Sequence, residues 1–355
     1  MIELNKSKLE RVKPIFSEEI KKIKKDSLAP WQECETLGEV YLFPEKNNEE
    51  AIEFLFLLGA LNFSYWEKNE DGGIYTWGVR TSAGEKVVDV FALAYTLADA
   101  RERGWLQYDS DFYREITDDQ LRKIFSDRLD GSCQIPMFPH RRLKIRELGE
   151  GLKQFSRAKD RKPSAGDFIS YYETVPDLLA GLKKYFPLSF GDPFYKLPQL
   201  MVKMLIDRRD ENMPPDRRFE SSGIYNQATQ FEEIDSLKAQ PDYMLPLFCM
   251  RVGLWEMDDS IGKTIADKRE IPMDHPYERA LRQRTVETVE KIASAQEGSP
   301  GLNNCRVDSI MWQTAVKRCF PCECEGCPFS GVCDAFQGKN DRLTWTHHLT
   351  RTPNY

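Results

Sequence analysis

Histidine is scarce in this sequence, with only four among 355 residues. None of the four lies in an H-E-x-x-H pattern, and neither a G-x-S-x-G motif nor a phosphate-binding P-loop is present. Hydrolases that use a catalytic triad and nucleoside triphosphatases therefore have no support in the sequence. The pair Gly72-Gly73 indicates a turn rather than a loop that binds phosphate.

Long apolar runs and an excess of positive charge are also lacking. No stretch of about eighteen apolar residues occurs, which argues against a membrane-spanning helix. The charged start, MIELNKSKLERVKP, lacks the apolar part of a secretory signal and predicts a cytoplasmic protein. The net charge is −7, and because binding to duplex DNA draws on Lys and Arg, this disfavours a nucleic-acid partner. The basic stretches 141–146 and 160–163 are expected to be solvated helix faces.

Apolar and aromatic residues are plentiful, at 41% and 12% of the chain, and they predict a packed globular protein. Their spacing predicts a mainly α fold, in which the helix over 49–62 is apolar all round and therefore buried on most sides. Alternating Tyr75, Trp77 and Val79 after a glycine turn predict a small β-hairpin near 72–82. The other expected helices cover residues 87–100, 117–127, 141–157, 165–185, 195–208, 244–256, 276–296 and 306–318, the last one after a break at 299–304.

The polar, proline-containing stretch 208–223 is typical of a hinge between two lobes. The sequence therefore predicts an N-terminal helical lobe over 1–207, which carries the hairpin, and a C-terminal helical lobe over 224–355. We expect the two lobes to share one core.

Cysteines are concentrated near the C-terminus, where six of nine fall between Cys305 and Cys333. In a cytoplasmic protein such density indicates a metal centre rather than disulfides. A zinc ribbon normally separates its two C-x2-C pairs widely, whereas only Glu323 lies between Cys322 and Cys324. An iron–sulfur cluster is therefore favoured, with zinc and unliganded thiols as the alternatives.

Two aspartates stand out by their local context. Asp242 lies shortly before Pro246, and because proline suits the first turn of a helix, a helix should begin close to Asp242. The helix dipole would keep that carboxylate ionised, as a group facing a developing cation requires. Asp308 and Trp312 are four residues apart and share one helix face, where they could bind the edge and the face of a flat base. A plain helix cap and a core tryptophan are the alternatives.

Short motifs occur in FLFLLGALNFSYW (54–66), in PFYKLPQLM (193–201) and in four further segments. In order, these segments resemble those of the queuosine salvage proteins, the queuosine 5′-phosphate N-glycosylase/hydrolase family. FLFLLGALNFSYW resembles its apolar helix ending in L-N-F-[SC]-F-W, and PFYKLPQLM matches its F-Y-K-x-x-Q. Departures include Gly59, where the family often has Asp, and Met244 and Leu247, which replace an Arg and a Gln. The matching segments together are residues 54–66, 135–152, 193–201, 231–247, 307–313 and 348–355.

The resemblance implies a helical fold similar to helix-hairpin-helix DNA glycosylases, and hydrolysis of queuosine 5′-phosphate or a related 7-deazaguanine nucleoside to release queuine. It implies that Asp242 stabilises an oxocarbenium-like sugar, and that Asp308 bonds the pyrimidine edge of the base. The implied substrate-binding residues are Phe63, Tyr195 and Trp312 as stacking walls, Lys196 and Arg351 toward a 5′-phosphate, and Gln199 and Tyr243.

The cysteine run is similar to the 4Fe–4S loop, C-x6-C-x2-C-x5-C, of endonuclease III and adenine glycosylases. This second resemblance implies a structural cluster bound by Cys319, Cys324, Cys327 and Cys333, with Cys322 as an alternative ligand. Four residues, not six, separate Cys319 from Cys324. The alternative functions are an iron–sulfur DNA or RNA base glycosylase, which would flip its target base out of the helix, and a zinc-stabilised binding module.

Overall fold

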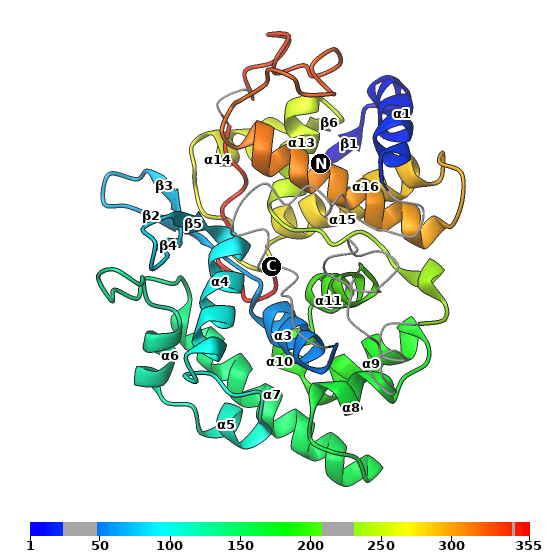
Figure 1. The fold of residues 1–355 in the computed structure, drawn as a ribbon. Coiled ribbons are helices and arrows are strands. Elements are labelled where there is room, and N and C mark those ends of the chain that lie inside the picture. Colours follow the sequence, from blue (N-terminus) through cyan, green and yellow to red (C-terminus); the bar gives the residue numbers. More distant parts are fainter. Residues whose placement is uncertain (24–47, 208–230, 343–344) are drawn as a thin grey trace. The chain divides into compact units, whose positions relative to one another are not determined.

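A computed structural model describes residues 1–23, 48–207, 231–342 and 345–355, and these form a mainly helical protein, as predicted (Figure 1). The chain divides into two compact units. Unit 1 comprises Met1–Pro30, Ile234–Pro353 and Tyr355, and unit 2 comprises Trp31–Glu233 and Asn354. The expected hinge, 208–223, lies outside the described residues.

The N-terminal segment belongs to unit 1 because its first strand finds its partner far along the chain. Strand β1 (Ile2–Leu4) pairs antiparallel with β6 (Trp255–Met257), so that Ile2 lies opposite Met257. The lobe expected over 1–207 therefore differs from unit 2 at its start.

Helix α3 (Asn48–Leu61) forms the centre of unit 2, and the prediction of a helix buried on most sides is confirmed. It contacts α11 (Lys196–Asp207), α7 (Phe138–Lys159) and α4 (Asp89–Glu102). Gly59 is needed where α3 meets α11, because a Cβ atom there would lie 2.8 Å from Cβ of Met201. An aspartate at position 59 would not fit this packing.

The remaining helices of unit 2 are short, and all but α10 begin at a residue whose side chain caps the first turn. The helix expected over 165–185 is in fact two, because Thr174 starts a new helix by accepting a hydrogen bond from the amide of Asp177 at 3.2 Å. The elements are α5 (Ser110–Glu115), α6 (Asp118–Ile124), α8 (Ala165–Ser170), α9 (Val175–Tyr185) and α10 (Pro187–Phe190).

The region of the predicted hairpin contains two consecutive hairpins. Strand β2 (Trp66–Lys68) pairs with β3 (Ile74–Thr76), and β4 (Gly78–Arg80) pairs with β5 (Lys86–Val88), both antiparallel. The predicted range, 72–82, therefore covers the second strand of one hairpin and the first strand of the next. Gly72 has φ +76°, which explains the turn signal in the sequence.

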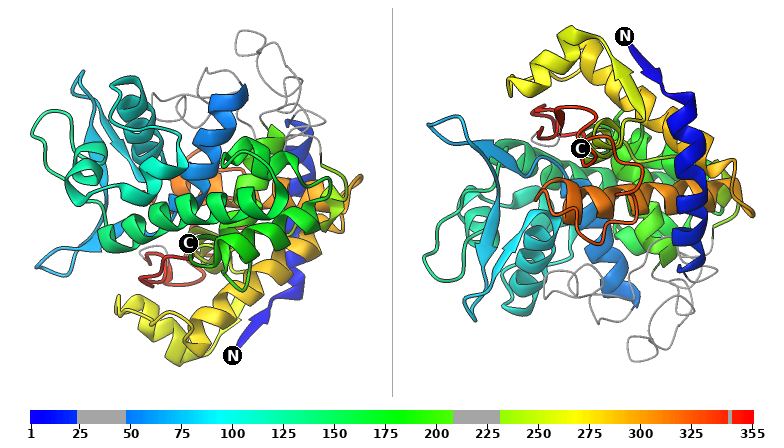
Figure 2. Two further views of the ribbon diagram at one scale, coloured as in Figure 1. Left: turned by 90° about the horizontal axis from the view of Figure 1, so that it is seen from below. Right: turned by 90° about the horizontal axis from the view of Figure 1, so that it is seen from above.

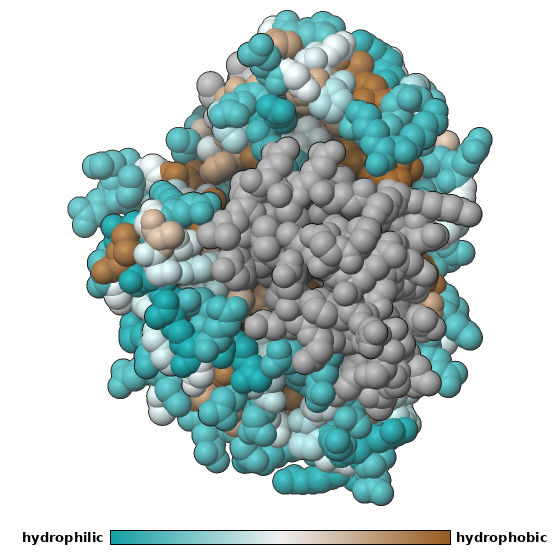
Figure 3. Space-filling view, in the orientation of Figure 1, coloured by the Kyte–Doolittle hydropathy of each residue, from teal (hydrophilic) through white to brown (hydrophobic). Residues whose placement is uncertain are grey.

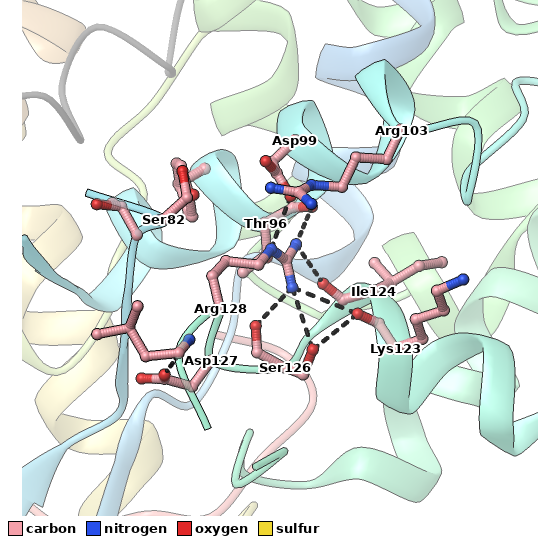
Figure 4. Close-up of polar contacts among 12 residues, drawn as sticks. Ser82, Thr96, Asp99, Arg103, Lys123, Ile124, Ser126, Asp127 and Arg128 are labelled. Atoms are coloured by element: carbon pink, nitrogen blue, oxygen red, sulfur yellow. Dashed lines mark hydrogen bonds and ion pairs between the residues drawn. The ribbon is translucent and has the colours of Figure 1, made fainter. Parts of the chain in front are cut away.

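A buried arginine joins α4 to the end of α6 (Figure 4). The Arg128 side chain is 3% exposed, and its Nε lies 2.7 Å from Oδ2 of Asp99. Its other nitrogens donate to carbonyl oxygens, including that of Ile124 at 3.0 Å. A cation is favourable at the C-terminal end of a helix, where carbonyl oxygens lack intrahelical partners.

Removal of this side chain should destabilise the protein. We expect Arg128→Ala to lower the free energy of unfolding by about 3 kcal/mol, because it leaves Asp99 and several carbonyl groups without their buried partner. The matched control is Arg103→Ala, since Arg103 contacts the same Asp99 oxygen at 2.8 Å but is 40% exposed. That change should cost less than about 1 kcal/mol. Urea unfolding of both variants measures the difference, and equal losses would contradict the assignment.

Unit 1 is built around three helices, α13 (Met244–Val252), α15 (Pro276–Ala293) and α16 (Pro300–Thr314), with α1 (Lys6–Lys21) lying across α16 in Figure 2. The prediction that residues 299–304 break the chain before the last helix was wrong, because α16 already begins at Pro300. Ser299 caps α16 by accepting from the amide of Leu302 at 3.3 Å, and Pro300 occupies the first helical position, which proline favours. The smaller elements are η2 (Ile234–Ser236), α14 (Asp259–Ala266) and the π-helix η3 (Ala315–Cys319).

The described surface visible in Figure 3 is mostly hydrophilic. Within the described ranges, no helix has both the length and the apolar character that crossing a membrane demands.

Candidate active site

The carboxylate of Asp242 lies at the start of α13, as the sequence predicted. Its Oδ1 accepts hydrogen bonds from the amides of Met244 at 2.7 Å and Leu245 at 3.2 Å, and the residue is 6% exposed. These amides and the helix dipole favour the ionised carboxylate. The contacts are those of a helix cap, and they also hold the carboxylate in one position.

Asp308 is tied to the same turn. It lies in α16, is 4% exposed, and its Oδ2 accepts from the amide of Gln240 at 2.8 Å. Because Gln240 is two residues before Asp242, unit 1 links the two predicted acids through one short backbone segment. Trp312, one helical turn after Asp308, is half-buried.

Arg282 and Glu278, a buried pair on α15, support this turn from the other side. Nε of Arg282 donates to the carbonyl of Pro241 at 3.2 Å, and its guanidinium lies 3.5 Å from the Glu278 carboxylate, with both side chains 2% exposed. The same guanidinium covers the ring of Tyr355, 4.4 Å from its centroid. A buried ion pair of this kind fixes backbone position more than it adds stability.

The C-terminal residues form an aromatic cluster around Tyr243. The ring of His347 lies 4.4 Å from that of Tyr243, and Nε2 of His348 lies 3.2 Å from the hydroxyl of Tyr355. Burial lowers the pKa of His347 to about 4 and that of His348 to about 3. Both imidazoles are therefore neutral near pH 7, and neither adds positive charge to the cluster.

In unit 2, two cations lie on the ring of Phe63. The guanidinium of Arg141 is 4.2 Å and Nζ of Lys144 is 4.5 Å from the ring centroid, and all three residues are buried. The expectation that 141–146 is a solvated helix face was therefore wrong for these two residues. Arg141 donates to the carbonyls of Phe63 at 2.6 Å and Ser64 at 3.1 Å, which satisfies backbone acceptors after the end of α3.

Lys196 lies next to this group. Its Nζ donates to the carbonyl of Asn62 at 3.3 Å, its amide donates to Asp192 at 2.9 Å, and the residue is 5% exposed. Tyr195 is half-buried and has φ +55°, an unusual value for a tyrosine. Gln199 is buried, and its side-chain amide donates to the carbonyl of Phe194 at 3.1 Å.

Arg351 differs from the other predicted substrate-binding residues in its surroundings. Its Nε lies 3.3 Å from the Glu270 carboxylate, and both side chains are well exposed, at 37% and 40%. Because Arg351 is already paired and exposed to water, it would bind a phosphate group more weakly than a buried lysine or arginine would.

The four predicted cluster ligands, Cys319, Cys324, Cys327 and Cys333, line one pocket in unit 1. Cys322 does not line it, and its Sγ instead lies 3.4 Å from both terminal nitrogens of Arg251. The described residues contain no group of three or more Cys, His, Asp or Glu side chains that could hold a single metal ion.

Sequence reasoning missed the supporting residues of both units. Arg282 and Glu278 gave no signal beyond helical spacing. Arg141 and His348 lie inside segments that carried the resemblance, and His347 adjoins one, so those motifs could have indicated them. Their burial could not be predicted, because it depends on carbonyl groups and rings distant in sequence.

Unit 1 thus places two buried aspartates, Asp242 and Asp308, on either side of one short backbone segment of a helical scaffold. The family described as queuosine salvage protein matches residues 42–165 and 219–328, more than half of the sequence. The chain belongs to this family.

Three relatives, each called queuosine 5′-phosphate N-glycosylase/hydrolase, are similar over most of their length. The protein of Sphaerobacter thermophilus is 27% identical, over 74% of this chain and 76% of its own. That of Nematostella vectensis is 25% identical over 71% and 68%, and that of Mus musculus is 24% identical over 77% and 79%.

The buried histidines predict acid sensitivity. Between about pH 6.5 and 3 the unfolded chain protonates His348 while the folded chain cannot, so stability falls as pH falls. At pH 5 this should cost about 2 kcal/mol. His348→Gln should therefore narrow the stability difference between pH 7.5 and pH 5 by about that amount. Denaturant unfolding at both pH values, with exposed His140→Gln as the control, measures it. Equal pH dependence in wild type and His348→Gln would contradict the burial argument.

Proposed function

We propose that this protein hydrolyses the N-glycosidic bond of queuosine 5′-phosphate, or of a related 7-deazaguanine nucleotide, and releases the free base queuine for salvage. The observation that carries the proposal is the position of Asp242, whose carboxylate accepts two amide hydrogen bonds at the start of α13, in a chain that belongs to the queuosine salvage protein family. The names of the three relatives supply the substrate.

In the proposed reaction the bond between C1′ of the ribose and N9 of the base breaks, and its electron pair stays on the base. The sugar then carries oxocarbenium character, which the Asp242 carboxylate stabilises electrostatically. Water attacks C1′ and loses a proton, with Asp242 as its acceptor, while N9 of the base takes up a proton. The products are ribose 5-phosphate and queuine.

Leaving-group assistance has to reach the pyrimidine edge, because a 7-deazaguanine has no N7 to protonate. We assign this role to Asp308, whose position is fixed by the Gln240 amide. A carboxylate accepts hydrogen bonds from the N–H groups of that edge and so holds the base in place, whereas a protonated carboxyl group can donate one to an acceptor atom of the base and so stabilise the leaving group. The half-buried indole of Trp312 lies one turn further along the same helix and suits the face of the base.

The remaining substrate contacts are assigned by residue type. Lys196 is the candidate for the 5′-phosphate, because it is a buried cation, and Arg351 ranks below it, because it is paired with Glu270 in an exposed position. Tyr195, Gln199, Tyr243 and Phe63 complete the proposed set, with Phe63 acting through the cations stacked on it. The reaction is a hydrolysis and requires no redox cofactor. A cytoplasmic location belongs to the same proposal.

Replacement of Asp242 tests the reaction. Asp242→Asn can still accept the two amide hydrogen bonds but loses the charge, so we expect an intact fold and at least a 100-fold loss of kcat, roughly what one electrostatic group contributes. The control is Asp259→Asn, an exposed aspartate in the first turn of α14. Release of queuine, followed by chromatography and mass spectrometry, is the measurement.

The proposed reaction fails if wild-type protein, brown or colourless, leaves queuosine 5′-phosphate intact. Base release from DNA or RNA by that same sample would identify the nucleic-acid glycosylase instead. Undiminished queuine release by Asp242→Asn would show that this carboxylate is not catalytic, whereas wild-type protein that releases no base from any of these substrates would favour a binding module.

If Lys196 binds the 5′-phosphate, its replacement should weaken binding of the nucleotide but not of the nucleoside. We expect Lys196→Gln to raise KM for queuosine 5′-phosphate about tenfold, the loss of one charge-assisted contact, and to leave KM for queuosine nearly unchanged. Lys184→Gln, an exposed lysine on α9, is the control. Thermal melting confirms that each variant is folded. An equal change in KM for both substrates would show that Lys196 does not read the phosphate.

A further inference from the structure

Four cysteine side chains converge on one pocket at the end of α16, outside the proposed reaction. The pocket is small, with a cavity volume of about 20 Å³, and its other walls include Phe248 and Val252 from α13 and Phe329 from the loop itself. The cysteines around it are Cys319, Cys324, Cys327 and Cys333.

Local backbone structure sends each of these cysteines toward the pocket. Cys319 ends the π-helix η3, and π-helical turns are frequent at functional sites because they redirect the chain. The amide of Cys327 donates to the carbonyl of Cys324 at 3.2 Å across a turn that contains Gly326, which has φ +70°. The amide of Cys333 donates to the carbonyl of Phe329 at 2.9 Å. The loop therefore has a defined fold of its own.

The loop is anchored to the core of unit 1 independently of the cysteines. The ring of Phe329 lies 5.0 Å from that of Phe16 and 4.9 Å from that of Phe248. Nζ of Lys8 donates to the carbonyl of Val332 at 2.7 Å and pairs with Asp334. These contacts hold the pocket open in one shape, which a metal centre requires of its ligands.

A buried positive charge faces the same region. Arg251 is 3% exposed, and it donates to the carbonyls of Cys319 and, at 2.7 Å, Trp345. Its Nε is buried without a hydrogen-bond partner, and its two terminal nitrogens each lie 3.4 Å from Sγ of Cys322. A buried guanidinium is costly without a nearby anion. A thiolate-bound inorganic centre would supply that negative charge.

The residue types in the pocket suit an iron–sulfur cluster, because the irons of such clusters are bound by Cys thiolates and all four candidate ligands are cysteines. Four thiolates can also bind one zinc ion. The described parts of the chain contain no group of three or more Cys, His, Asp or Glu side chains that could hold a metal ion, so analysis of the bound metal has to distinguish the two.

We propose that Cys319, Cys324, Cys327 and Cys333 bind a 4Fe–4S cluster, with Cys322 outside the ligand set. Binding a preassembled cluster requires each thiol to lose its proton and involves no electron transfer with the hydrolysis. The cluster is structural. It fixes the loop against Arg251 and Val252 at the C-terminal end of α13, whose N-terminal end carries Asp242.

The test is the metal content of the full chain, purified without oxygen. We expect a brown protein that absorbs near 400 nm, with about four iron atoms and about four acid-labile sulfides per chain. Cys324→Ser and Cys327→Ser should each lose most of the iron. The matched controls, Cys322→Ser and Cys133→Ser, should keep the wild-type iron and sulfide content.

Three results would overturn the proposal. One is a colourless protein with about one zinc per chain, and another is wild-type protein that takes up neither iron nor sulfide under anaerobic reconstitution. The third is loss of the cluster in Cys322→Ser with retention in Cys324→Ser, which would assign different ligands. Circular dichroism distinguishes cluster loss from unfolding. None of these measurements depends on enzymatic activity. The proposal of a cluster and the proposal of hydrolysis are therefore tested independently of each other.

Discussion

The fixation of α13 at both ends is the constraint on which unit 1 depends. At its start, Asp242 accepts from the amides of the first turn, and at its end the backbone of Arg251 and Val252 accepts from the amides of Ala335 and Asp334. Buried helix ends need such partners because their amides and carbonyls have none within the helix. One nine-residue helix thereby links the proposed catalytic carboxylate to the cysteine loop.

In both units, buried arginines donate hydrogen bonds to backbone carbonyl groups at or near helix ends. Arg141 serves the end of α3, Arg128 serves the end of α6, and Arg282 holds the carbonyl of Pro241 before α13. The negative end of a helix dipole favours each of the first two. In this acidic protein, these three buried arginines therefore bind backbone carbonyl groups and do not form part of a basic surface.

Three positions at which the sequence analysis noted departures from the family's motifs are buried. Met244 and Leu247 are 4% and 0% exposed, and they belong to the apolar packing of α13. At Gly59, α11 approaches α3 too closely for a side chain. The packing of each unit therefore suits the residues present at these three positions.

Local signals in the sequence determined the mainly helical fold, the all-round burial of 49–62, the start of a helix near Asp242 and the clustering of the cysteines. These depend on periodicity, proline geometry and spacing, which a sequence carries directly. Tertiary structure alone decided that Arg141 and Lys144 are buried, that β1 pairs with β6, and that Cys322 lies outside the pocket. Each of these features depends on contacts with residues far along the chain. Local periodicity and turn residues carry no information about such contacts.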